Sequence, residues 1–199
     1  MTTLLLVRHA HCDHVGRRLV GRAAGVRLSE QGTCEAEALA ARLASVALSA
    51  VYASPLERAE QTARALAAPH GLEIRTVEEL VELDYGDWTG LTMDEVRERP
   101  EWRSYSGSRS TAAPPNGEGL AAVQERALRA MRRIATAHPD GTVAAVSHGD
   151  VIRSLVAHVA RIPLDAIDRF EVLPASVSIV ELGVGWERLR SLNSGVLPG

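Results

Sequence analysis

The feature that most constrains the fold is an alternation of apolar runs of strand length with amphipathic patterns of helical period. Apolar runs without polar alternation are typical of strands that are covered on both faces. They occupy residues 3–7, 50–54, 142–147 and 176–182, with a weaker run at 72–77. Between them, apolar residues recur at steps of three and four over residues 39–46, in a pattern that follows the cap-like Ser29, and over residues 120–134 and 151–159. Because right-handed crossovers return each strand in the same direction, this order predicts an α/β fold with a mostly parallel sheet and helices on both faces.

Two segments depart from the alternation. In the stretch SVSIVELGVGWERLRSL, Gly183 and Gly185 lie between two strand-like runs, which predicts an antiparallel hairpin at one edge of the sheet. Residues 99–119 are rich in Ser, Gly and Pro, which predicts a long surface loop. Loops of that length are often lids or disordered segments.

Length and composition predict one domain over residues 1–199, because 199 residues that are 46% hydrophobic can bury one substantial core. The formal net charge of -3 offers no global cationic surface for nucleic acid or anionic lipid. No run approaches the roughly 20 apolar residues of a membrane helix, and the first residues lack the basic region and cleavage site of a signal peptide. Two cysteines, Cys12 and Cys34, are too few for a disulfide framework. We expect a cytoplasmic monomer or homodimer.

Candidate functional residues follow the apolar runs, where the carboxyl ends of parallel strands form the ligand-binding edge of an open sheet. Arg8 and His9 follow the first run, and His148 follows the run at 142–147. The run at 50–54 leads into SPLERAEQTA, in which Ser54 is expected to cap a helix that starts at Pro55, with a capping box completed by Glu57.

Arg58 falls in the first turn of that expected helix. A cation there opposes the helix dipole unless an anion binds between it and the free backbone N–H groups. Guanidinium groups match phosphate oxygens, and a neutral imidazole nitrogen can attack phosphorus. Arg8, Arg58, His9 and His148 at one edge therefore predict a phosphoryl pocket.

Five segments in this order resemble the histidine phosphatase superfamily, also called phosphoglycerate mutase-like. They are LVRHA, SPLERAEQTA, ELDYGDWTGLT, NGEGLAAVQER and VSHGDVIR, and the likeness covers about residues 3 to 157. The resemblance implies a metal-independent phosphatase without a cofactor that forms a covalent phosphohistidine on His9. It also implies that Arg8, Arg58 and His148 hold the phosphoryl oxygens and that Glu82 is the general acid and base. Asp84 and Asp87 are the alternative carboxylates for that role.

The chain also departs from the family pattern. Arg-His-Gly-Glu-Thr/Ser is replaced by Arg8-His9-Ala10-His11-Cys12, and the family's phosphate-binding asparagine is Val15 here. His11 and His14 are candidates to replace the lost contact.

The sequence motifs have three other interpretations: a metallohydrolase, a mutase and a phospho-ligand-binding protein. His9, His11, Asp13 and His14 have the ligand spacing of a metallo-β-lactamase-type hydrolase. Later ligands would then come from His70, Asp84 and His138. That interpretation leaves Arg8, Arg58 and the VSHG segment unexplained.

A mutase is disfavoured because ELDYG lacks the Arg-His that follows the glutamate in glycolytic mutases. A catalytically idle phospho-ligand-binding protein would not need a nucleophile and a proton donor together.

The substrate predicted by these residues is a small phosphorylated metabolite. Specificity in this superfamily lies in the loops. The side chains that could line a substrate pocket or simply cover the core are Trp88, Trp102, Arg103, Tyr105 and Arg109.

Overall fold

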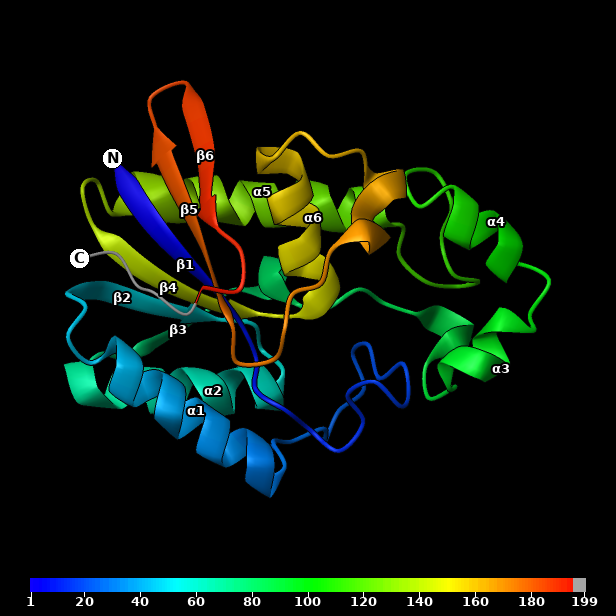
Figure 1. Ribbon diagram of the computed structural model, residues 1–199, viewed down its shortest axis with the longest axis horizontal. Helices are drawn as coiled ribbons and strands as arrows, with labels where there is room; N and C mark the ends of the chain where they lie inside the picture. The colour runs from blue at the N-terminus through cyan, green and yellow to red at the C-terminus, as the bar shows by residue number, and fades with distance from the viewer. Residues whose placement is uncertain (195–199) are drawn as a thin grey trace.

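A six-stranded sheet with the order β3-β2-β4-β1-β5-β6 forms the centre of the computed structural model, which describes residues 1–194 (Figure 1). The strands are β1 (Thr2–Arg8), β2 (Leu48–Ala53), β3 (Ile74–Thr76), β4 (Thr142–Ser147), β5 (Val177–Gly183) and β6 (Trp186–Ser191). The pairs β1–β4, β2–β4 and β2–β3 are parallel, whereas β5 runs antiparallel to β1 and β6 antiparallel to β5. The predicted α/β fold with a mostly parallel sheet and an antiparallel edge hairpin is confirmed.

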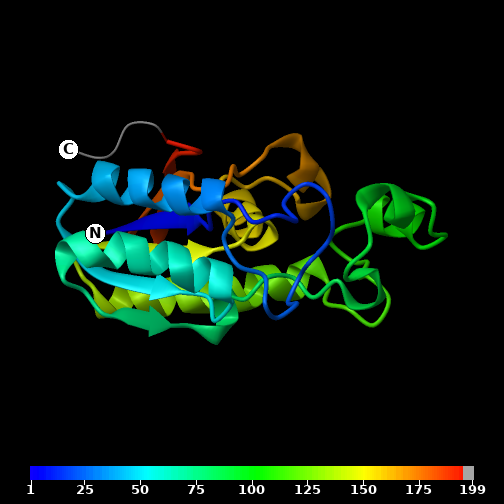
Figure 2. The ribbon, with the colours of Figure 1, turned by 90° about the horizontal axis from the view of Figure 1, so that it is seen from below.

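Helices cover both faces of the sheet, and the alternation of side chains along β1 explains how both layers are held. Leu5 and Val7 pack in the cluster with α1 (Glu30–Leu43) and α2 (Glu57–Ala67), and Leu4 and Leu6 pack in the cluster with α5 (Leu120–Ala137) and α6 (Gly149–Val159). The remaining helices are α3 (Met93–Arg97), α4 (Trp102–Gly107) and the 3-10 turns η1 (Ala68–His70), η2 (Glu78–Leu80), η3 (Gly86–Trp88) and η4 (Leu164–Arg169). Figure 2 shows α3 and α4 projecting beyond one end of this sandwich.

The two expected helix starts have different outcomes. Ser29 caps α1 as predicted, since its side chain accepts a hydrogen bond from the backbone N–H of Gly32. Ser54 does not cap α2, which begins at Glu57 with Leu56 at the cap position and no side-chain capping bond. The capping-box prediction is wrong: the Ser54 hydroxyl lies 2.6 Å from a ring nitrogen of His148 and accepts from only one backbone N–H of residues 1–194, that of Leu56 at 3.4 Å. The Glu57 carboxylate accepts from the Gly25 N–H at 2.8 Å.

Residues 99–119 are more ordered than their composition suggested, because they contain helix α4. Trp102 and Tyr105 from α4 pack against Trp88, with the Trp88 and Tyr105 rings edge-to-face at 5.0 Å between centroids. Burial of these aromatic rings stabilises a short helix that the Ser- and Gly-rich sequence does not favour by itself. Trp88 and Tyr105 are therefore packing residues, and Arg103 is exposed.

Among residues 1–194, no helix combines the length and the apolarity that crossing a membrane requires.

The contact between α1 and the segment after β1 gives a stability prediction. A Cβ atom on Gly32 would lie 1.9 Å from the backbone oxygen of His11, so Gly32→Ala must push α1 away from that segment. We expect a loss of about 1–3 kcal/mol in the free energy of unfolding, the usual cost of overpacking. Gly107→Ala is the matched control, because a Cβ there meets nothing within 4 Å. Equal unfolding midpoints for the two variants in thermal denaturation would contradict this packing.

Candidate active site

Strand pairing brings the candidate residues together at the carboxyl ends of three neighbouring strands. Arg8 pairs with Ser147 in the register of β1 and β4, and the His9 N–H donates to the Ser147 carbonyl at 2.9 Å. The Ser54 N–H, just past β2, donates to the carbonyl of Val146 at 3.0 Å. The rings of His9 and His148 consequently lie 5.2 Å apart between centroids.

His9 is held in the protonation state that a nucleophile needs. Its Nδ1 lies 2.8 Å from the carbonyl oxygen of Ala10, so the ring proton sits on Nδ1 and leaves a lone pair on Nε2. Burial, followed by the charges of Arg58 and Arg8, lowers the pKa of His9 to about 3. Because the side chain is only 4% exposed, its Nε2 carries a neutral and weakly hydrated lone pair.

His148 is fully buried and also neutral. Burial lowers its pKa well below the ordinary value, and the positive charges of Arg58 and Arg8 act in the same direction. Its Nε2 lies 2.6 Å from the hydroxyl of Ser54, and its Nδ1 has no hydrogen-bond partner in the described part of the chain. When Ser54 donates to Nε2, the proton of His148 sits on Nδ1 and remains free to donate to a ligand.

Arg8 and Arg58 contribute two cations without counter-charges. Neither guanidinium forms an ion pair with a carboxylate within residues 1–194, although Arg58 is only 1% exposed. Arg58 donates from Nε to Nε2 of His9 at 3.2 Å and from Nη2 to the carbonyl of Gly21 at 2.7 Å. Arg58 Nη1 and Arg8 Nε are buried and have no partner in the described residues. Buried donors of this kind are satisfied by an anion.

Glu82 is the carboxyl group at the edge of this cationic cluster. It is 8% exposed, and its Oε1 accepts a hydrogen bond from the Leu83 N–H at 2.9 Å. Burial, and then the negative charge of Asp150, raise the pKa of Glu82 to about 7, against the opposing effects of that hydrogen bond and of Arg58 and Arg8. A carboxyl group with this pKa can both give and take a proton near neutral pH.

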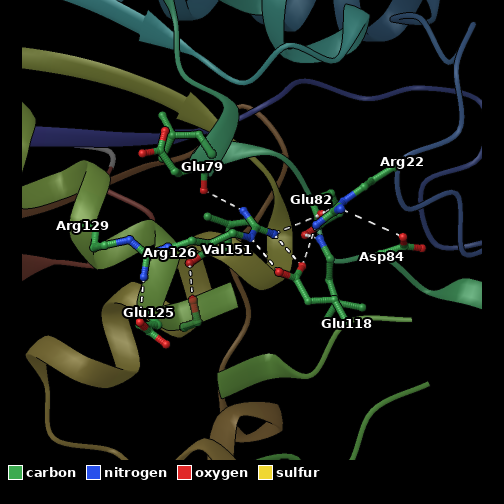
Figure 3. A network of polar contacts seen from close by, with 12 residues as sticks. Arg22, Glu79, Glu82, Asp84, Glu118, Glu125, Arg126, Arg129 and Val151 are labelled. Atoms are coloured by element: carbon green, nitrogen blue, oxygen red, sulfur yellow. Dashed lines mark hydrogen bonds and ion pairs between the residues drawn. The ribbon is translucent and has the colours of Figure 1, made fainter. Parts of the chain in front are cut away.

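A polar network holds the main chain of Glu82, as Figure 3 shows. The Glu82 carbonyl accepts from Nε of Arg22 at 2.9 Å and from Nη2 of Arg126 at 3.2 Å. Both arginines also bind the carboxylate of Glu118. The sequence alone assigns no role to Arg22, Glu118 or Arg126. Arg126 carried a signal, since it is a charged residue on the buried stripe of α5, whereas nothing local marks Arg22.

The other sequence candidates take up contacts of their own. The ring of His11 binds Glu35 of α1, with Nδ1 at 2.7 Å from Oε1, and His14 is exposed. Asp84 accepts from the Gly86 N–H, and Asp87 accepts from the side chain of Asn116. Within residues 1–194 no group of three His, Cys, Asp or Glu side chains is arranged to hold a metal ion, so the metallohydrolase interpretation lacks a ligand set there.

Arg109, a candidate for the substrate pocket, is buried behind the site. It pairs with Asp168 at 3.3 Å and with Asp150 at 3.6 Å, and its guanidinium lies over the ring of Tyr105. Asp150 also accepts from Tyr85 at 2.8 Å. Arg109 therefore ties residues 99–119 to α6 and η4 rather than facing solvent.

Comparison with known proteins identifies a family for this arrangement. The family model of the histidine phosphatase superfamily (branch 1) matches residues 4–195. Phosphoserine phosphatase 1 of Hydrogenobacter thermophilus is 32% identical over 187 residues, which cover 92% of this chain and 87% of that protein. The adenosylcobalamin/alpha-ribazole phosphatase of Escherichia coli is 30% identical over 193 residues, covering 96% and 95% of the two chains.

A solved structure agrees with these sequence relatives. Mycobacterial glucosyl-3-phosphoglycerate phosphatase superposes with a TM-score of 0.87 at 28% identity, covering 97% of this chain and 99% of that one. The similarity therefore includes the whole sheet and the helices around it.

The electrostatics of the site give a titration prediction. Because the charge of Asp150 raises the pKa of Glu82, Asp150→Asn should lower the pKa of Glu82 below about 7. We would follow the side-chain carboxyl carbon of Glu82 by NMR as a function of pH. Asp168→Asn is the control, since Asp168 shares the partners Arg109 and Arg153 but is not among the groups that shift Glu82. An identical Glu82 pKa in all three proteins would refute the assigned cause.

Proposed function

The chain belongs to the histidine phosphatase superfamily, and from this we propose that it hydrolyses a small phosphate monoester through a covalent phosphohistidine on His9. Phosphohistidine chemistry is typical of this family, whose hydrolases need no metal, and the similar proteins named above are phosphatases. The observation that carries the assignment to His9 is its buried, neutral ring, whose Nε2 accepts a hydrogen bond from Arg58 and whose pKa is also lowered by the charge of Arg8.

In the first step, Nε2 of His9 attacks the phosphorus atom and the bond from phosphorus to the ester oxygen breaks. A phosphoryl oxygen takes over the hydrogen bond that Arg58 Nε donates to His9, which frees the lone pair. Arg8 and Arg58 neutralise the phosphoryl charge, and Nδ1–H of His148 donates to it. Protonated Glu82 gives its proton to the leaving oxygen, so an alcohol departs rather than an alkoxide.

In the second step, water attacks the phosphorus atom of phosphohistidine. The carboxylate of Glu82 takes a proton from that water, the bond between phosphorus and Nε2 breaks, and inorganic phosphate leaves. Nε2 regains its lone pair, and Glu82 is again protonated for the next cycle. The pKa of about 7 allows Glu82 to serve both steps near neutral pH.

The substrate class is inferred from the relatives. They are named as a phosphoserine phosphatase, an adenosylcobalamin/alpha-ribazole phosphatase and a glucosyl-3-phosphoglycerate phosphatase, and such phosphatases act on small phosphorylated substrates. Hydrolysis is favoured over mutase activity because the segment after Glu82 lacks the Arg-His pair of the glycolytic mutases. The nearly neutral pKa of Glu82 favours catalysis over idle ligand binding. Residues 99–119 remain a proposed lid, and the cytoplasmic location and the monomeric or homodimeric state remain predictions.

The nucleophile can be tested on a panel of small phosphate esters. We expect turnover that survives excess EDTA, falls with vanadate, and drops by more than about a thousandfold in His9→Ala, the size of effect typical of a lost nucleophile. Rapid quenching with radiolabelled substrate should trap the phosphoryl group on wild-type protein and not on His9→Ala. Equal labelling of both proteins would place the covalent intermediate on another residue, and activity that EDTA abolishes and zinc restores would favour the metal interpretation.

The role of Arg58 can be tested by anion binding. Arg58→Ala should weaken inhibition by vanadate and by phosphate about 10- to 100-fold, as expected for the loss of hydrogen bonds to a charged group. Arg64→Ala is the matched control, because Arg64 lies on the same helix, is exposed and pairs with Glu60. If vanadate inhibits Arg58→Ala and Arg64→Ala equally, Arg58 has no part in holding the phosphoryl group.

A further inference from the structure

The dipeptide Gly21-Arg22 lies between the two halves of the proposed site. The carbonyl of Gly21 accepts a hydrogen bond from Nη2 of Arg58 at 2.7 Å, on the side of the nucleophile. The next residue, Arg22, donates from Nε to the carbonyl of Glu82 at 2.9 Å, on the side of the proton donor. Two adjacent residues in the segment between β1 and α1 thus touch a phosphoryl-binding arginine and the carboxyl residue.

Close packing leaves this dipeptide little freedom. Gly21 has a φ of +46°, a conformation that residues with a Cβ rarely adopt. A Cβ on Gly21 would also lie 3.1 Å from the carbonyl oxygen of Leu83 and 3.1 Å from the ring of Tyr85. The dipeptide is therefore in contact with the segment that carries Glu82.

The guanidinium of Arg22 is fixed at both ends. Its Nη2 binds Oε2 of Glu118 at 2.7 Å while its Nε holds Glu82, and Glu118 is itself bound by Arg126 (Figure 3). The side chain of Arg22 is 37% exposed, and without it Glu118 would keep Arg126 as its partner. Loss of Arg22 should therefore remove a contact to Glu82 without leaving a buried charge unpaired.

The position of the Glu82 carboxyl group depends on its main chain. Residues 81–85 lie outside the helices and strands, between η2 and η3, so no regular ladder of hydrogen bonds holds them. The carboxyl group is in turn tied back to the Leu83 N–H. A shift of the main chain at Glu82 would carry the carboxyl group with it.

We propose that Arg22 is a positioning residue for proton transfer: it holds the main chain of Glu82 so that the carboxyl group faces the leaving oxygen. Arg22 acts through Glu82 and leaves binding of the phosphoryl group to Arg8 and Arg58. This inference rests on the proposed role of Glu82 as general acid.

The leaving group distinguishes this role from a merely structural one. An alkyl phosphate must have its leaving oxygen protonated, whereas p-nitrophenolate departs as a stable anion and depends little on a general acid. The ratio kcat/KM reports steps up to formation of phosphohistidine, so it isolates the step in which Glu82 gives its proton. We would measure kcat/KM for p-nitrophenyl phosphate and for the most active alkyl phosphate of the panel.

Arg22→Ala should lower kcat/KM about 10- to 100-fold for the alkyl phosphate, the size of effect that misplacement of a catalytic group produces. The loss for p-nitrophenyl phosphate should be much smaller, and vanadate inhibition should be unchanged. Arg22→Met keeps the aliphatic stem of the side chain without its donors and should give the same pattern, which keeps the test valid if the alanine variant folds poorly.

Two further variants complete the test. Arg18→Ala is the matched control, since Arg18 lies in the same segment and donates to the backbone carbonyl of Gly90 at 2.7 Å rather than to Glu82; it should behave as wild type. Equal losses on both substrates for the Arg22 variants, or the same selective loss in Arg18→Ala, would overturn the proposal. Glu82→Gln must itself show the selective loss on the alkyl phosphate. If Glu82→Gln does not, the general-acid assignment fails first and the role of Arg22 fails with it.

Discussion

Parallel pairing of β1 with β4 is the interaction on which the rest of the site depends. The register that joins Arg8 to Ser147 places two histidines one residue beyond the ends of neighbouring strands. A shift of this register by one residue would move the apolar side chains of β1 to the wrong faces of the sheet, so the spacing of the two strand ends is fixed by the sheet. The apolar faces of β1 reinforce this, because Leu5 and Val7 are packed under one helical layer and Leu4 and Leu6 under the other. A site built on these strand ends is positioned before any ligand arrives.

Burial then determines the chemistry of the groups at these strand ends. Burying two arginines without carboxylate partners costs free energy of folding. In the proposed reaction, the phosphoryl group of the substrate supplies the missing negative charge. The same low exposure keeps His9 neutral and raises the pKa of the Glu82 carboxyl group to about 7. One environment therefore lowers the pKa of an imidazole and raises the pKa of a carboxyl group, which suits the two different roles proposed for His9 and Glu82.

Residues other than Arg8, His9, Arg58 and His148 hold the neighbouring segments in place. The pair of Arg126 and Glu118 joins α5 to the segment of Glu82, and Arg22 joins the same pair to the segment after β1. Arg109 does the equivalent for residues 99–119, by way of Asp150 and Asp168. Asp150 pairs with Arg109 in that second network and also raises the pKa of Glu82. The contacts that hold residues 99–119 therefore include a residue that acts on Glu82.

The sequence by itself determined the order of strands and helices, the edge hairpin, and the residues Arg8, His9, Arg58 and His148, because hydrophobic periodicity and strand-end position are local properties. It also suggested that Ser54 capped a helix, which is wrong, and it gave no sign that residues 99–119 contain the short helix α4. Ser54 binds His148, which is 94 positions away, and α4 forms because its aromatic residues pack on Trp88. The hydrogen bonds to the Glu82 carbonyl likewise come from Arg22 and Arg126, which are 60 and 44 positions away. Only the tertiary structure decided these contacts, because each of them joins residues that are distant in the sequence and meet only when the chain folds.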